Sequence, residues 1–135
     1  MDGIESLSEN ARSACKSLIE YFGGIEDYLE IIVIKLRQGE FQKASEDLID
    51  FADHMNLAVS GVDEVMASIP LGDRSLTGEQ FQEGVNYLIT SMKDFVEKQS
   101  KKNIPEMVNC IEEDLIPCLK TWRTFYIPSM EQSLI

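Results

Sequence analysis

The sequence is poor in the residues from which reactive centres are built. Its 135 residues include one histidine, three cysteines and one tryptophan. Cys15, Cys110 and Cys118 form an odd set without C-x-x-C spacing, which argues against a zinc site and against a disulfide framework. We therefore expect three buried free thiols and a reducing, cytoplasmic location.

Basic residues are scarce as well. There are 12 Lys and Arg against 24 Asp and Glu, which gives a formal net charge of −12. A nucleic-acid footprint needs a dense basic patch, and an anionic lipid leaflet repels an acidic protein. The chain has no apolar run near the ~20 residues of a membrane span, and its first residues lack the pattern of a signal peptide. We expect neither nucleic acid nor a membrane as a partner.

Hydrophobic residues recur every seven positions along two long segments, which is typical of helices that bury one face. In the first segment one register holds Ile4, Ala11, Leu18, Ile25 and Ile32, and a second holds Leu7, Ala14, Tyr21 and Tyr28. In the second segment the register holds Phe41, Leu48, Met55, Val62 and Ile69. The spacing predicts one helix from residue 4 to the turn at 38–40 and another over 41–69.

The pair Gly23-Gly24 allows two interpretations of the first segment. Two adjacent glycines ordinarily indicate a turn, but the hydrophobic register keeps its phase across them, which a loop would break. We favour one long helix of about 50 Å, bent or weakened at the glycines, over two shorter helices. Such a helix would overhang a four-helix bundle, and its apolar stripe would need cover from the C-terminal tail, a second subunit or a partner.

Two further helices are predicted in the second half of the chain. Residues 77–80, Thr-Gly-Glu-Gln, read as a capping box that opens a third helix, and residues 103–106, Asn-Ile-Pro-Glu, begin a fourth. Pro117 lies inside the fourth pattern, so we expect a kink there with the carbonyl of Glu113 left without its usual donor. Pro128 is expected to end that helix.

Together these segments predict an all-α, antiparallel up-down-up-down four-helix bundle in a single domain. Its parts are a hairpin over 4–69, a hairpin over 78–127 and a C-terminal tail over 128–135. Residues 46–49, Glu-Asp-Leu-Ile, recur as residues 113–116, which suggests that the two hairpins are a duplication. The alternative is that two amphipathic hairpins share their periodicity by chance, and both interpretations stay open.

No constellation of residues predicts catalysis. Glu46, Asp50 and His54 follow one another at helical spacing, but a single histidine without a Glu-x-x-His pair does not make a di-metal site. His54 also raises the hypothesis of histidine phosphotransfer, a reaction hosted by acidic bundles of this size. No Lys or Arg follows within 54–61 to hold a phosphoryl group, so we expect an ordinary helical histidine. We predict no metal, no cofactor and no enzyme.

Two segments resemble known proteins. Residues 36–44, Leu-Arg-Gln-Gly-Glu-Phe-Gln-Lys-Ala, and residues 113–122, Glu-Asp-Leu-Ile-Pro-Cys-Leu-Lys-Thr-Trp, resemble an uncharacterised family of small helical proteins of clostridial-type Gram-positive bacteria. In that family a D/E-L-x-P-x-L-x-x-W segment lies in the last helix. The resemblance implies a helical bundle of bacterial, cytoplasmic origin. A general similarity in size, charge and architecture to flagellar export chaperones adds no residue-level match.

These observations lead to the hypothesis of a non-enzymatic protein-interaction module, an adaptor or an export-chaperone-like bundle. Residues 1–67, which contain the first hairpin, carry 14 acidic against 5 basic residues, and residues 68–135 carry 10 against 7. The residues predicted to bind a partner are the large side chains of the first and last helices: Tyr21, Phe22, Tyr28, Trp122, Tyr126 and Met130. The alternative from another class is a structural protein that dimerises through its first helix.

Overall fold

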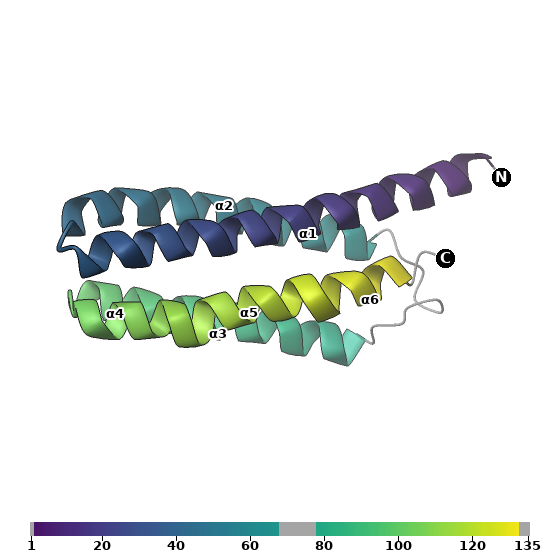
Figure 1. Cartoon of the computed structure of the whole chain (residues 1–135). Helices are drawn as coiled ribbons and strands as arrows, with labels where there is room; N and C mark the ends of the chain where they lie inside the picture. Colours follow the sequence, from purple (N-terminus) through teal and green to yellow (C-terminus); the bar gives the residue numbers. More distant parts are fainter. Residues whose placement is uncertain (1, 68–77, 133–135) are drawn as a thin grey trace.

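Four antiparallel helical rods form the bundle shown in Figure 1. The computed structural model describes residues 2–67 and 78–132, with side chains from residue 9 onwards. The rods are α1 (Asp2–Arg37), α2 (Phe41–Ala67), α3 (Gly78–Ser100) and a C-terminal rod over 104–132. The predicted all-α four-helix bundle is confirmed. The position of Ile69, the residue Thr77 of the capping box and the end of the predicted tail lie outside the described residues.

Helix α1 runs without interruption through Gly23-Gly24, which confirms the single long helix. Phe22 and Ile25, on either side of the pair, are both buried in the core, so the hydrophobic stripe stays in phase. The helix ends at Arg37, and Gly39 in the turn that follows has a φ of +77°, the left-handed conformation that glycine adopts readily. There the N–H of Glu40 donates to the carbonyl of Lys35, and the chain turns directly into α2.

The C-terminal rod consists of three α-helical segments joined by two π-helical turns. The segments are α4 (Ile104–Cys110), α5 (Ile116–Thr121) and α6 (Ile127–Gln132), with π turns over Ile111–Leu115 and Trp122–Tyr126. Each π turn comes directly before an Ile-Pro pair, at Pro117 and at Pro128. The disturbance expected at Pro117 thus takes the form of a wider turn, in which the N–H of Ile116 donates to the carbonyl of Ile111.

The prediction that Pro128 ends the last helix is wrong. The second π turn absorbs this proline as the first absorbs Pro117, because the N–H of Ile127 donates to the carbonyl of Trp122, five residues earlier. The wider turn gives the proline ring room where an α-helical carbonyl would clash with it. Helix α6 therefore continues to Gln132, and the residues assigned to the start of a tail belong to the bundle.

The centre of the core is built around the single tryptophan. Trp122 is fully buried and stacks near Phe22, with 6.2 Å between ring centroids. Its indole N–H donates to the carbonyl oxygen of Gly84 on α3, at 3.1 Å. A Cβ at position 84 would lie 2.9 Å from the indole, so glycine is required for this close approach. The contact joins α3 to the C-terminal rod.

One side of the bundle is wider than the other three. Helix α1 packs against α2 and against the C-terminal rod, and the rod packs against α3. Among the described residues, however, no Cα of α2 lies within 8 Å of a Cα of α3. If a two-fold axis related the two hairpins, the contact between α1 and the C-terminal rod would have a counterpart between α3 and α2. These two helices do not make that contact, so the arrangement departs from two-fold symmetry.

A nearly buried carboxylate links α1 to the C-terminal rod. Glu26 is 8% exposed and accepts from Arg123 through both oxygens, at 2.6 Å from Nε and 3.4 Å from Nη2. The hydrogen bond and the negative charge of Glu26 raise the pKa of Arg123. No helix in the described part of the chain is both long and apolar enough to cross a membrane.

Candidate functional site in the seam between helices α1 and α2

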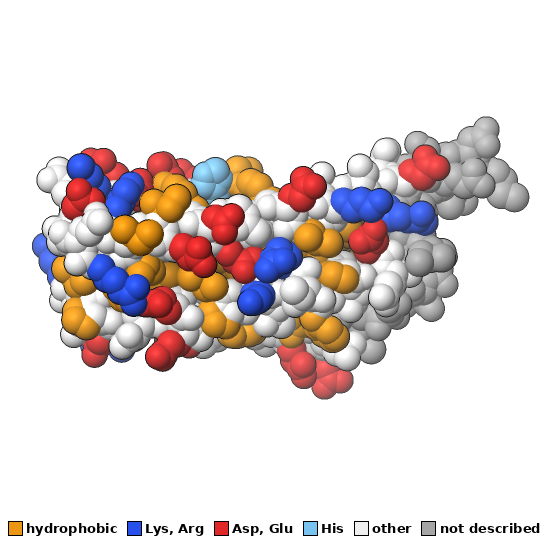
Figure 2. All heavy atoms as spheres, in the orientation of Figure 1, with side chains coloured by type: hydrophobic (Ala, Val, Ile, Leu, Met, Phe, Trp, Pro, Cys, Tyr) orange, Lys and Arg blue, Asp and Glu red, His pale blue; other side chains and the backbone are white. Residues whose placement is uncertain are grey.

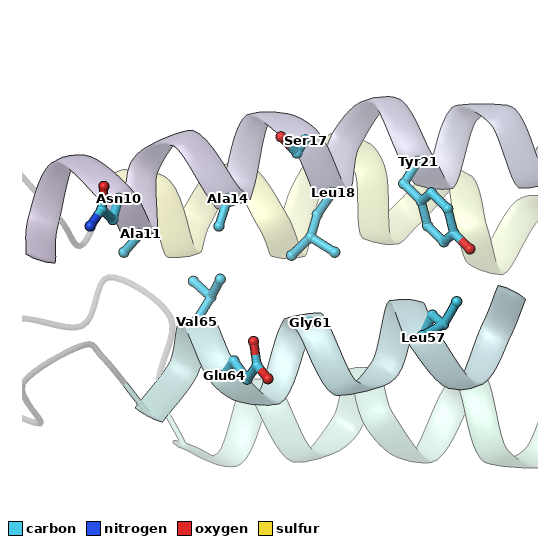
Figure 3. A pocket seen from close by; sticks show the side chains of 10 residues that line it. All are labelled: Asn10, Ala11, Ala14, Ser17, Leu18, Tyr21, Leu57, Gly61, Glu64 and Val65. Atoms are coloured by element: carbon cyan, nitrogen blue, oxygen red, sulfur yellow. The ribbon is translucent and has the colours of Figure 1, made fainter.

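Two adjoining hollows open along the seam between α1 and α2. The larger has a volume of about 610 Å³ (Figure 3). Its lining consists of Asn10, Ala11, Ala14, Ser17, Leu18 and Tyr21 from α1 and Leu57, Gly61, Glu64 and Val65 from α2. The second, of about 440 Å³, is lined by Ser17, Glu20, Tyr21, Gly24, Ile25, Tyr28 and His54. Ser17 and Tyr21 border both hollows, so we treat the two hollows together as one groove. We call it the seam groove.

The groove exists because small residues stand where two packed helices usually carry large ones. A Cβ at Gly61 would lie 2.9 Å from Cδ2 of Leu18, so the helices approach closely at this point. In Figure 3 Ala14 and Leu18 project from α1 toward α2, and Val65 projects back toward α1. The short side chains of Ala14 and Ser17 leave the space beside this contact unfilled, and Leu57 stands exposed at the edge.

An aromatic cluster borders the second hollow. The hydroxyl of Tyr21 lies 2.5 Å from Nδ1 of His54, and the rings of Tyr21 and Tyr28 approach the imidazole edge-on at 5.7 and 6.1 Å between centroids. Burial raises the pKa of Tyr28 to about 12, and the neighbouring Asp47 and Asp50 add to the effect. The phenol therefore stays neutral at physiological pH. Asp47 itself pairs with Lys35.

The groove is apolar along its floor and acidic at its edges. Of the described residues that line the two hollows, Glu20 and Glu64 carry negative charge and none is Lys or Arg. Asp50 lies beside the aromatic cluster and adds a third carboxylate near the groove. The histidine, pale blue in Figure 2, is at the surface with hydrophobic side chains beside it. Such a lining is chemically complementary to apolar groups flanked by positive charge.

The structure divides the residues predicted to bind a partner into two groups. Tyr21 and Tyr28 line the seam groove. Phe22, Trp122 and Met130 are fully buried, so they have no surface to offer a partner, and this part of the prediction is corrected. They lie on the core-facing stripes, where large apolar side chains are removed from water.

Tyr126 joins neither group fully. It is half-buried, and its ring packs against Trp122 with 4.8 Å between centroids.

The sequence did not predict Ala14, Ser17 and Gly61 as groove residues. They contribute to the groove because their side chains are small or absent. In the sequence these three positions stand out only as small residues. Their place at the contact between two helices can be recognised only when the register between the helices is known.

His54 lies in surroundings that suit a packing role. Glu20 shares its hollow, and the described lining offers no cation to hold a phosphoryl group. The acidic residues near His54 on α2 do not form a metal site with it. Over the described residues, no group of three or more His, Cys, Asp and Glu side chains is arranged to hold a metal ion.

The three cysteines are buried thiols in the core. Burial raises the pKa of Cys118 to about 12 and, with smaller contributions from Glu131 and Asp114, those of Cys15 and Cys110 to about 11. A neutral, buried thiol does not react with a disulfide reagent. We therefore expect less than about 0.1 thiol per folded chain to react with Ellman's reagent at pH 8, and all three to react in denaturant. Rapid labelling of the folded chain would contradict this arrangement.

The fold and the groove define a small acidic four-helix-bundle protein with an open groove on its first hairpin. Residues 13–125 match the family described as a domain of unknown function, DUF8042. The match spans most of the chain, so the chain belongs to this family. No match is found among curated proteins or among solved structures.

Proposed function

We propose that this protein is a non-enzymatic interaction module, an adaptor or export-chaperone-like bundle, whose seam groove binds a basic amphipathic helix of a protein partner. The observation that carries the proposal is the lining of the groove, which is apolar along its length and bordered by carboxylates without a described Lys or Arg. The three free cysteines support a reducing, cytoplasmic setting for this interaction.

The dimensions of the groove suit a helix. Its lining on α1 extends from Asn10 to Tyr28, which corresponds to about 27 Å at 1.5 Å per residue, the length of a helix of about 18 residues. A helix laid in a groove of this kind anchors apolar side chains at i, i+3, i+4 and i+7. Lysines or arginines beside those anchors would then reach Glu20 on one side and Glu64 on the other.

The proposal predicts binding of a designed probe and its loss when the groove is filled. The probe is a fluorescein-labelled 18-residue peptide of leucine and lysine with leucines on one helical face. We expect it to bind with a dissociation constant in the micromolar range, measured by fluorescence anisotropy, on the order of 10 µM. Ser17→Arg, at an exposed position that borders both hollows, should weaken binding at least tenfold, because it fills the groove and repels the peptide.

Two controls separate the groove from the overall negative charge. Thr90→Arg is at an exposed position on α3, away from the groove, and changes the net charge by the same amount. It should alter the affinity less than about twofold, since a distant surface charge is screened by salt. A peptide of the same composition with a scrambled order should bind more weakly than the amphipathic one. Equal losses in both variants, or equal binding of both peptides, would refute the proposal.

A further inference from the structure

The second hollow of the seam groove is bordered by aromatic rings. Tyr21 and Tyr28 lie about two turns apart on α1, and both line the hollow together with His54 of α2. The planes of the tyrosine rings make angles of 64° and 74° with the imidazole, so neither ring is stacked flat on it. Three aromatic rings, whose faces carry partial negative charge, therefore border one space of about 440 Å³.

The space between the two tyrosines is open because Gly24 lies there. Positions 21, 24 and 28 share one face of the helix, since they are three and four residues apart. Gly24 lines the hollow, and a Cβ at this position would meet no side chain of another turn or helix within 4 Å. The hollow thus extends to the backbone of α1 between the two rings. Glycine is otherwise unfavourable inside a helix of 36 residues.

The electrostatic surroundings of this hollow are negative. Among the described residues that line it, Glu20 carries a negative charge and none is Lys or Arg. Burial, and then the charges of Asp47 and Asp50, raise the pKa of Tyr28 to about 12. A field that opposes the formation of a phenolate favours a cation in the same place. Lys35 pairs with Asp47 and is not among the lining residues, so this lysine does not fill the hollow itself.

We propose that the second hollow is a cation site, which receives an ammonium or guanidinium group between the rings of Tyr21 and Tyr28. A cation beside aromatic faces is attracted by the ring quadrupoles, and more strongly where water is partly excluded. The larger hollow differs, since Tyr21 is the one aromatic residue in its described lining. The cation site stands on its own geometry. Its assignment to a lysine or arginine side chain of the partner helix rests on the proposed function.

Choline and its neutral carbon isostere, in which a tert-butyl group replaces the trimethylammonium group, test the site without any peptide. The two molecules have the same shape, so a difference in affinity reports the charge. We expect choline to bind the full chain with a dissociation constant on the order of a few millimolar, and the isostere to bind at least fivefold more weakly. Titration of the backbone amide signals by NMR measures both, at about pH 8, where a neutral imidazole does not repel the cation. The largest shifts should fall at Tyr21, Gly24 and Tyr28. Equal affinities, or no binding of choline at about 50 mM, would overturn the proposal.

Two variants and one control place the cation in the hollow. Gly24→Leu fills the space and keeps both tyrosines, and leucine favours a helix more than glycine does, so the variant keeps the fold. It should weaken choline binding at least tenfold. Tyr28→Leu removes one ring and should weaken binding at least threefold. Tyr87→Leu, at an exposed tyrosine on α3, should change it by less than about 1.5-fold. Circular dichroism verifies the fold of all three. Unchanged binding in Gly24→Leu, or equal losses in Tyr28→Leu and Tyr87→Leu, would overturn the site.

The 18-residue leucine and lysine peptide separates the cation site from the proposed function. We expect Tyr28→Leu to weaken its binding about threefold as well, because a lysine of the peptide occupies the hollow. If choline binds but the affinity for the peptide is unchanged in Tyr28→Leu, the hollow serves a free small cation and its assignment to the partner is overturned. If the peptide binds while choline and its isostere bind equally, the cation site fails and the proposed function stands. If choline is preferred and the peptide does not bind, the proposed function fails and the cation site stands.

Discussion

Replacing Trp122 with alanine is expected to lower the free energy of unfolding by about 3–5 kcal/mol. The side chain is fully buried, and aromatic rings surround it, with Phe22 and Phe81 at 6.2 and 6.1 Å between centroids. Alanine would leave a cavity between three helical rods that aromatic neighbours cannot fill without leaving their own positions. The carbonyl of Gly84 would also lose its hydrogen-bond donor.

Trp122→Phe separates the packing of the ring from the hydrogen bond. Phenylalanine keeps most of the ring contacts and removes the indole N–H, so we expect a loss of about 1–2 kcal/mol, clearly smaller than that of alanine. Urea unfolding followed by circular dichroism at 222 nm measures all three proteins, since both variants lack the tryptophan fluorophore. A loss below about 1 kcal/mol for Trp122→Ala would show that the side chain is not the centre of the core.

The helices of the first hairpin could be predicted from the sequence because their evidence is local and repeated. A seven-residue register that keeps its phase is sufficient to carry α1 across Gly23-Gly24. The register acts through packing of every turn, and one weak pair of residues does not outweigh it. The same reasoning located the turn at Gly39, where the last turn of α1 gives way to the start of α2.

The effect of proline could be predicted only in part. A proline within a helix removes one hydrogen bond. The sequence alone does not show whether the helix then ends or continues through a wider, π-helical turn. In this chain both Pro117 and Pro128 follow π turns, and the rod continues because Met130 beyond the second proline is fully buried. Burial of later residues compensates for the lost hydrogen bond, and that compensation depends on the packing of the whole bundle.

Contacts between distant residues could not be predicted. Gly84 is small because Trp122, 38 residues later, packs onto it, and no local pattern marks that position. The groove residues show the same limit. The aromatic residues predicted as binding anchors included Phe22, which follows the core stripe. The real opening of the surface arises where Ser17 leaves space beside Gly61.

Replacing Arg123 with methionine is expected to cost about 2–3 kcal/mol of stability at pH 7. The change keeps a flexible apolar stem beside Gly23 and removes the cation from Glu26, which then stays nearly buried without its partner. Breaking a fully buried pair typically costs about 3–5 kcal/mol. The smaller figure follows because Arg123 is about one-third exposed, at 32%, and water screens part of the interaction.

A matched substitution and a double variant test this interpretation. Arg37→Met breaks a second pair between α1 and the C-terminal rod, with Glu112, and both of those side chains are exposed. Its cost should stay below about 1 kcal/mol. Combining Arg123→Met with Glu26→Gln removes the buried charge altogether, so the double variant should be more stable than Arg123→Met alone. If denaturant unfolding shows equal costs for Arg37→Met and Arg123→Met, or no recovery in the double variant, then burial of Glu26 does not set the strength of this link. The expected difference in cost between the two substitutions has one physical cause, which is that water reaches the carboxylate of Glu112 and is largely excluded from that of Glu26.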